Sequence, residues 1–215
     1  MDSKMINILI QEFGKTVYMV FFSTLFASVL GFIMGIVVTV TSPNGLKPNK
    51  IIYKFLDVII NVLRSFPFII LIVFIIPLTR AIVGTPIGET AAIVPLTIAA
   101  APFVARIIES ALKEVDPGVI EAAKSFGASN TQIIFKVMLK EAVPSIISGL
   151  TLTIISIIGY SAMAGSVGAG GLGKVAISYG YQRYQTDVMI VTVIILIIMV
   201  QGLQSLGNYL YKKLS

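Results

Sequence analysis

The chain of 215 residues contains no cysteine and no histidine. The missing cysteines exclude disulfides and thiol catalysis, and the two absences together exclude metal sites built from His or Cys. The sequence also shows no paired carboxylates and no nucleophile beside a base. We therefore expect no catalytic residues, no cofactor and no metal.

Charge is scarce as well, because Asp, Glu, Lys and Arg make up 12% of the residues, about half the share usual in soluble proteins. The formal net charge is +6, a sign that can indicate nucleic-acid binding. The basic residues are spread between apolar runs, however, so membrane topology explains them better and no nucleic acid is expected. With 56% hydrophobic residues, the chain is predicted to be an all-α polytopic membrane protein with one domain over residues 1–215.

Five apolar runs approach the roughly 20 residues that a helix needs to cross the hydrocarbon core of a membrane. They cover residues 17–40, 55–78, 90–108, 143–163 and 188–206. The first run is too long for a cleaved signal peptide, and no small-residue cleavage site follows it. It contains Gly31 and Gly35, a GxxxG spacing that permits close helix approach. The third run contains Pro95 and Pro102, which membrane helices tolerate.

The distribution of Lys and Arg predicts how the chain threads the membrane, because these residues accumulate in cytoplasmic loops. With the N-terminus outside, ten Lys and Arg residues fall in cytoplasmic segments and five in outside segments, leaving out Arg64 within a span. This bias predicts an outside N-terminus and a cytoplasmic C-terminus. The loop over residues 113–142 then lies in the cytoplasm.

That loop contains "EVDPGVIEAAKSFGASNTQ", a segment with helix start and stop signals. Asp116 can cap a helix with Pro117 at its first position, and Gly127 suits the left-handed residue that ends it. The segment from Ser129 to Gln132 fits a capping box that opens a second helix. The sequence therefore predicts a short helix between these signals.

One face of the predicted short helix is apolar. Its members follow the i, i+3, i+4, i+7 spacing and are Val119, Ala122, Ala123 and Phe126. The face is too small to span anything. It fits either a helix lying on the membrane surface or a docking helix for a soluble partner, to which two alanines would allow close approach.

The same residues resemble the EAA loop of permease subunits of bacterial ABC importers. Glu121, Ala122, Ala123 and Gly127 match the start of that motif, and Val137 and Leu139 stand at the positions of its later Ile and Leu. Lys140 occupies the position where the family usually has proline, and Pro144 follows shortly after. The resemblance implies that the short helix is a coupling helix, seated in a cleft of a separate ATPase subunit.

Two further stretches, "RSFPFIILIVFIIPLTRAIVGTPIGETAAIVPLTIAAAPFVARIIESAL" and "GYSAMAGSVGAGGLG", resemble the permeases of methionine ABC importers. The resemblance implies a five-span permease of type I architecture in the bacterial cytoplasmic membrane. It also implies a homodimer that forms the translocation pathway and binds two ATP-binding subunits. An extracytoplasmic methionine-binding lipoprotein would deliver methionine as the transported substrate.

The glycine run "GAGGLGKV" nearly fits two nucleotide-binding motifs, but Val175 replaces the Ser or Thr of a P-loop that would hold magnesium. Both motifs need a preceding strand, whereas a predicted span precedes this run. We therefore reject nucleotide binding and expect no ATPase site in this chain. The run instead suits a helix break with close backbone packing. Beside it, Met163 either fills a packing gap or helps to close the pathway opposite its twin in a dimer.

Three polar residues in the predicted spans are candidates for the transport pathway. Arg64 either lines a cavity near a substrate carboxylate, or serves structure by snorkelling or by pairing with Asp57. Tyr160 and Ser161 either touch a polar substrate or form hydrogen bonds between helices.

Other functions remain open from the residues alone. A permease of an ABC importer for another amino acid would share the EAA loop. An ion-coupled secondary carrier is the rival class, but carriers often place acidic or histidine residues at mid-membrane and show internal repeats. A membrane scaffold would not need the capped loop. A stoichiometric ATPase partner would separate the importer from the other two classes.

Overall fold

The computed structural model describes residues 3–214, and the regular elements within that range are all helical. This confirms the predicted all-α class. The α-helices are α1 (Ser3–Thr41), α2 (Lys50–Ser65), α3 (Phe68–Phe74), α4 (Ile76–Val83), α5 (Glu89–Lys113), α6 (Pro117–Ser125), α7 (Asn130–Gln132), α8 (Leu139–Ala164), α9 (Gly171–Lys174) and α10 (Thr186–Leu214). Three short π-helical segments are η1 (Ile133–Met138), η2 (Gly165–Ala169) and η3 (Val175–Tyr181).

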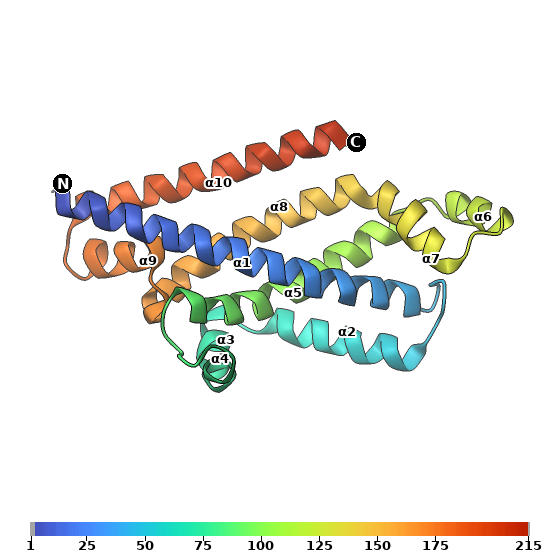
Figure 1. Ribbon diagram of the computed structural model, residues 1–215, viewed down its shortest axis with the longest axis horizontal. Coiled ribbons are helices and arrows are strands. Elements are labelled where there is room, and N and C mark those ends of the chain that lie inside the picture. The colour runs from blue at the N-terminus through green and yellow to red at the C-terminus, as the bar shows by residue number, and fades with distance from the viewer. Residues whose placement is uncertain (1–2, 215) are drawn as a thin grey trace.

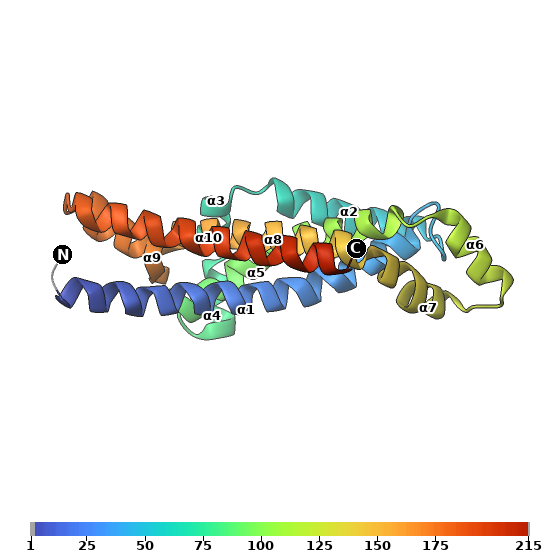
Figure 2. The ribbon, with the colours of Figure 1, turned by 90° about the horizontal axis from the view of Figure 1, so that it is seen from above.

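The long helices run side by side along the long axis of the molecule (Figures 1 and 2). Within residues 3–214, four helical stretches are long and apolar enough to cross a membrane, and a fifth results if the bent pair α2 and α3 counts as one span. The N-terminus and α9 lie at one end of the molecule, and α6 and α7 lie at the other. The predicted short helix is therefore far from the glycine run.

The run predicted as a span over residues 55–78 is not one straight helix, because α2 and α3 meet at an angle of 107°. The break lies at Pro67, which has no N–H for the helical ladder. Proline also disfavours helical backbone in the residue before it, and Phe66 is extended with φ −76° and ψ 123°. The chain after the break folds into the short helices α3 and α4 on one side of the bundle (Figure 1).

Helix α5 is the central helix of the bundle, and α1 packs along it through small residues. A Cβ on Gly31 would overlap the side chain of Val104, and a Cβ on Gly35 would lie 2.6 Å from Cβ of Ile108. The GxxxG spacing thus serves packing within the chain. Both prolines inside α5 are accommodated in a continuous helix, as the sequence predicted.

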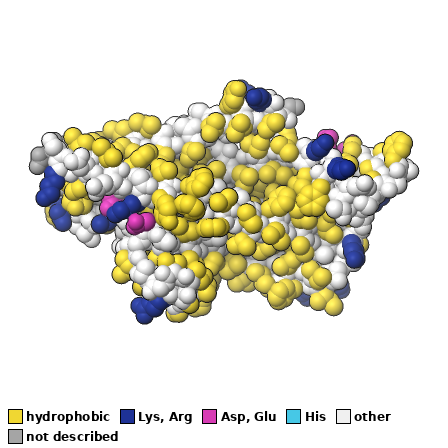
Figure 3. Space-filling view, viewed as in Figure 1, with side chains coloured by type: hydrophobic (Ala, Val, Ile, Leu, Met, Phe, Trp, Pro, Cys, Tyr) yellow, Lys and Arg dark blue, Asp and Glu magenta, His cyan; other side chains and the backbone are white. Residues whose placement is uncertain are grey.

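The core extends along the bundle rather than gathering in a sphere. Its middle is built around the fully buried Met19, Leu96 and Ile157, and a second cluster around Leu112 and Ile133 lies toward α6. Much of the outer surface between the two ends is apolar, whereas Lys and Arg side chains gather toward the ends of the face shown in Figure 3. This pattern fits lipid around the middle and water at both ends.

Candidate functional site

Helix α6 has the caps that its sequence predicts. The Asp116 carboxylate accepts a hydrogen bond from the Gly118 N–H at 2.7 Å, and Pro117 is the first helical residue. Gly127 follows the helix with φ +78°, a conformation that strongly favours glycine. The boundaries of the short helix are therefore set locally, by side chains and backbone that belong to it.

A reciprocal capping box begins the next helix and turns the chain back toward the bundle. The Ser129 hydroxyl accepts from the Gln132 N–H at 3.3 Å, and the Gln132 side chain accepts from the Ser129 N–H at 2.8 Å. Together the two capped starts hold α6 across the end of the molecule, beyond the ends of the long helices (Figures 1 and 2).

The apolar face of α6 is divided between the chain itself and its surroundings. Ala123 is half-buried and packs against the cluster around Leu112 and Ile133. Val119 is 41% exposed, Ala122 is exposed, and Phe126 is 91% exposed. The two alanines that the sequence paired as one docking surface thus have different environments. The surface left for a partner is formed by Val119, Ala122 and Phe126, which we call the α6 outer face.

Glu121 lies on a different side of α6. It is exposed, and with Lys124 it borders a cavity of about 580 Å³ between α6, the loop after α1 and the π-helical segment η1. Its carboxylate forms no ion pair within residues 3–214, so it is free to meet a basic group of a partner.

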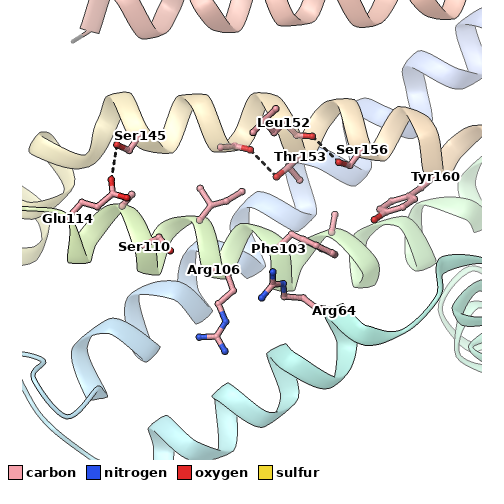
Figure 4. Close-up of a pocket in the computed structure, with 14 residues that line it drawn as sticks. Arg64, Phe103, Arg106, Ser110, Glu114, Ser145, Leu152, Thr153, Ser156 and Tyr160 are labelled. Carbon is pink, nitrogen blue, oxygen red and sulfur yellow. Dashed lines mark hydrogen bonds between the residues drawn. The ribbon is translucent and has the colours of Figure 1, made fainter.

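A cleft of about 360 Å³ lies between α2, α5 and α8 (Figure 4). Its wall combines apolar and aromatic side chains with arginines and hydroxyls. The lining residues are Arg64, Ala100, Phe103, Arg106, Ile107, Ser110, Ala111, Glu114, Ser145, Gly149, Leu152, Thr153, Ser156 and Tyr160. A polar cleft inside a membrane bundle is a default site for substrate passage.

A network of charges ties α2 to α5 at one side of this cleft. The Arg106 guanidinium bonds both Asp57 and Glu109 and donates to the Asn61 side chain at 2.9 Å. Lys113 donates to the second oxygen of the buried Glu109 at 2.6 Å. We call Asp57, Arg106, Glu109 and Lys113 the α2–α5 charge network. Sequence reasoning missed it, because Asp57 and Arg106 are 49 residues apart.

Arg64 is not the partner of Asp57, contrary to one structural interpretation of the sequence. Its guanidinium instead lies over the ring of Phe103, 5.1 Å from the ring centroid, and lines the cleft. Figure 4 shows Arg64 and Arg106 both projecting into the space between α5 and α2. Arg64 thus lines the cleft, and its role in transport stays a prediction.

The three candidate pathway residues on α8 lie in different environments. Tyr160 lines the cleft and stacks on Phe68 with ring centroids 4.8 Å apart. Ser161 is buried, and its hydroxyl donates to the Ile158 carbonyl at 2.7 Å, so its hydrogen bond lies within the helix rather than between helices. Met163 is 51% exposed, near the end of α8 that leads to the glycine run.

The glycine run forms a tight turn held against α1. Three of its glycines have positive φ, and the Gly171 N–H donates to the buried Glu12 carboxylate at 2.6 Å. The Leu172 N–H donates to the Thr16 hydroxyl at 2.8 Å, and a Cβ on Gly173 would overlap the Ala162 carbonyl oxygen. A helix, α8, precedes the run where a nucleotide motif needs a strand. Its glycines serve close backbone packing.

Comparison with known proteins shows consistent relatives. The family described as "Binding-protein-dependent transport system inner membrane component" matches residues 27–215. The chain is 49% identical over 207 residues to the "Probable D-methionine transport system permease protein MetI" of Vibrio cholerae, covering 96% of this chain and 92% of that one. It is 46% identical over 168 residues to the "Methionine import system permease protein MetP" of Bacillus subtilis, covering 78% and 76%.

Solved structures agree with the sequence relatives. An inward-facing crystal form of the MetNI methionine ABC transporter contains a chain that is 44% identical and superposes with a TM-score of 0.98 over 100% of both chains. A chain of an amino acid ABC transporter crystallised with histidines is 22% identical, covers 98% of this chain and 95% of that one, and has a TM-score of 0.81. That second likeness shows the shared fold.

Proposed function

Since the chain belongs to the binding-protein-dependent inner membrane components, and among them to the methionine ABC transporter permeases, we propose that α6 couples it to the ATPase subunit. The chain is the membrane permease of a methionine importer, and the ATPase of such a transporter is a separate subunit. The contact through which ATP hydrolysis acts on the membrane helices then has to lie on a surface of this chain.

The observation that carries the coupling role is the α6 outer face. Phe126 has almost no contact with its own chain, although it ends a helix whose two termini are firmly capped. A large exposed apolar side chain on a protruding, rigid helix fits the pocket of a protein partner. The match of Glu121, Ala122, Ala123 and Gly127 to the EAA motif supports the ATPase as that partner.

The proposed orientation places α6 in the cytoplasm and the N-terminus outside. The excess of Lys and Arg in the segments assigned to the cytoplasm supports it. The position of α6 and the glycine run at opposite ends of the molecule is consistent with one of them on each side of the membrane (Figure 1). The C-terminus of α10 then lies in the cytoplasm.

Two copies of this chain would form the pathway, with two ATPase subunits on the cytoplasmic side. The cleft between α2, α5 and α8 would be half of the route for methionine. Met163, exposed beside the glycine turn, would close the route near its outer end against the Met163 of the partner subunit. An extracytoplasmic methionine-binding lipoprotein would deliver methionine to that end, in keeping with the binding-protein-dependent family.

The coupling role is tested by replacing Phe126 with Asp or with Leu and measuring how much ATPase subunit co-purifies with the permease. Because Phe126 is 91% exposed, neither substitution removes packing within this chain. Phe126→Asp should lose most of the bound ATPase, whereas Phe126→Leu should retain most of it. Equal retention in both variants, at equal amounts of inserted permease, would show that the α6 outer face is not the coupling contact.

A further inference from the structure

The positive charges of the cleft are not equivalent. Arg106 is neutralised by Asp57 and Glu109, and Lys113 shares the Glu109 carboxylate. Arg64 lines the same cleft, and no carboxylate within residues 3–214 lies within ion-pair distance of it. The Arg64 side chain is exposed, so its guanidinium is open to a ligand that carries a negative charge.

The surroundings of Arg64 fit one class of ligand. Its planar guanidinium can bind a carboxylate with two parallel hydrogen bonds. Beside it lie the ring of Phe103 and the Tyr160 ring stacked on Phe68, which provide apolar contact area and favourable partners for a thioether sulfur. A ligand that combines a carboxylate with a flexible apolar side chain therefore has a favourable contact for each of these two groups.

The opposite end of the cleft has the opposite character. Glu114 lies there, directly after the end of α5 and eleven residues after Phe103, or about 16 Å along the helix axis. It accepts a hydrogen bond from the Ser145 hydroxyl at 3.3 Å (Figure 4). The two charged ends are too far apart to hold one amino acid together, and Glu114 repels a carboxylate. Only the Arg64 end can retain the substrate by its carboxylate.

We propose that Arg64 and Phe103 form a transient subsite in the membrane that binds the carboxylate of an α-amino acid with an apolar side chain. This inference rests on the proposed function, since it places methionine in the cleft during import. It assigns a selection step to the permease, in which ligands without a carboxylate are not retained. The aromatic rings discriminate only weakly between apolar side chains of different length. Arg106 does not serve in this role, because Asp57 and Glu109 already compensate its charge.

The absence of cysteine from the chain permits a direct test. Ser156 is exposed, lines the same cleft, and bonds only the Leu152 carbonyl of its own helix, so Ser156→Cys places a single thiol beside the subsite. The rate of its modification by N-ethylmaleimide is measured on the permease chain of the assembled transporter. The rate is measured at increasing concentrations of methionine and, separately, of methioninamide, which lacks the carboxylate.

Methionine should slow the modification, and methioninamide should not. In the Arg64→Gln background the methionine concentration for half-protection should rise about tenfold or more, the effect expected for losing a charge-assisted pair. Arg64→Lys should give an intermediate value, because it keeps the charge without the planar fork. The matched control is Arg80→Gln, which removes an exposed arginine of α4 outside the cleft and should leave the protection unchanged.

Equal protection in the Arg64→Gln background, or equal protection by methionine and methioninamide, would overturn the subsite. So would the lack of protection by methionine in a Ser156→Cys transporter that still imports methionine when its binding protein is added. In that last case the proposed function stands and the subsite alone fails. A wild-type complex that imports no methionine under these conditions would instead contradict the proposed function.

Discussion

Replacing Arg106 with methionine perturbs the α2–α5 charge network at its centre. Methionine keeps most of the apolar stem of the arginine and removes the charge that joins Asp57 on α2 to Glu109 on α5. The Glu109 side chain is only 5% exposed, whereas those of Arg106 and Asp57 are 20% and 29% exposed. Removing one partner of a fully buried pair costs about 3–5 kcal/mol.

The expected cost here is lower than that range. Glu109 keeps its contact with Lys113 at 2.6 Å, and water reaches part of Asp57. We therefore expect Arg106→Met to reduce the free energy of unfolding by about 2–3 kcal/mol. The matched control is Lys113→Met, which removes a cation from the same carboxylate. The Lys113 side chain is 48% exposed, so the expected cost is below about 1 kcal/mol.

The assay is unfolding of the purified transporter in mixed micelles with an increasing fraction of denaturing detergent, followed on the permease chain. A third variant combines three substitutions, Asp57→Asn, Arg106→Met and Glu109→Gln. It removes both carboxylate charges together with the guanidinium, and should recover part of the free energy of unfolding that Arg106→Met loses. A central role of Arg106 in the charge network is refuted if Lys113→Met costs as much as Arg106→Met. It is also refuted if the triple variant is less stable than Arg106→Met alone.

Three further predictions concern the two ends of the molecule. Gly173→Ala should lower the folded yield in size-exclusion chromatography, because its Cβ overlaps the Ala162 carbonyl and relieving the overlap costs about 1–3 kcal/mol; a normal yield would contradict the packing assigned to the glycine turn. Gly127→Val should leave the permease folded, since a Cβ there meets nothing within 4 Å, but should reduce ATPase binding, because φ +78° strains a β-branched residue by about 1–3 kcal/mol. In intact cells an impermeant thiol reagent should label Lys174→Cys and not Lys124→Cys, and the reverse pattern would refute an outside N-terminus.

Local signals in the sequence predicted the parts of the fold that local physics determines. The start of α6 at Asp116 and Pro117, its end before Gly127 and the capping box at Ser129 all depend on residues within one turn of each other. The apolar runs likewise predicted the long helices, because burial in lipid depends on composition over about 20 residues.

Contacts between residues distant in the chain could not be predicted from the sequence. Helix α1 extends back to Ser3, well before the apolar run that starts at Val17, and in this extension Glu12 and Thr16 bond the glycine turn more than 150 residues later. Hydropathy alone gives no reason to extend the helix through a buried glutamate.

The candidate site could be predicted only in part, because it too depends on contacts between residues distant in sequence. The EAA pattern identified the residues of α6, but only the packed structure shows Ala123 turned toward the chain and Phe126 toward the surroundings. Arg64 was recognised as unusual because of its place in an apolar run. Arg64 does not pair with Asp57 because Arg106 does so instead. Arg106 is distant from Asp57 in the sequence, so this ion pair could not be predicted.

In the mechanism described above, this chain carries methionine across the membrane by coupling to ATP hydrolysis on a separate subunit. The most direct measurement is uptake of radiolabelled methionine into proteoliposomes that contain the permease, its ATPase subunit and the binding protein. We expect accumulation that requires ATP and all three proteins, and that is lost in Phe126→Asp but retained in Phe126→Leu. Accumulation without the ATPase subunit, driven by an ion gradient, would contradict this mechanism.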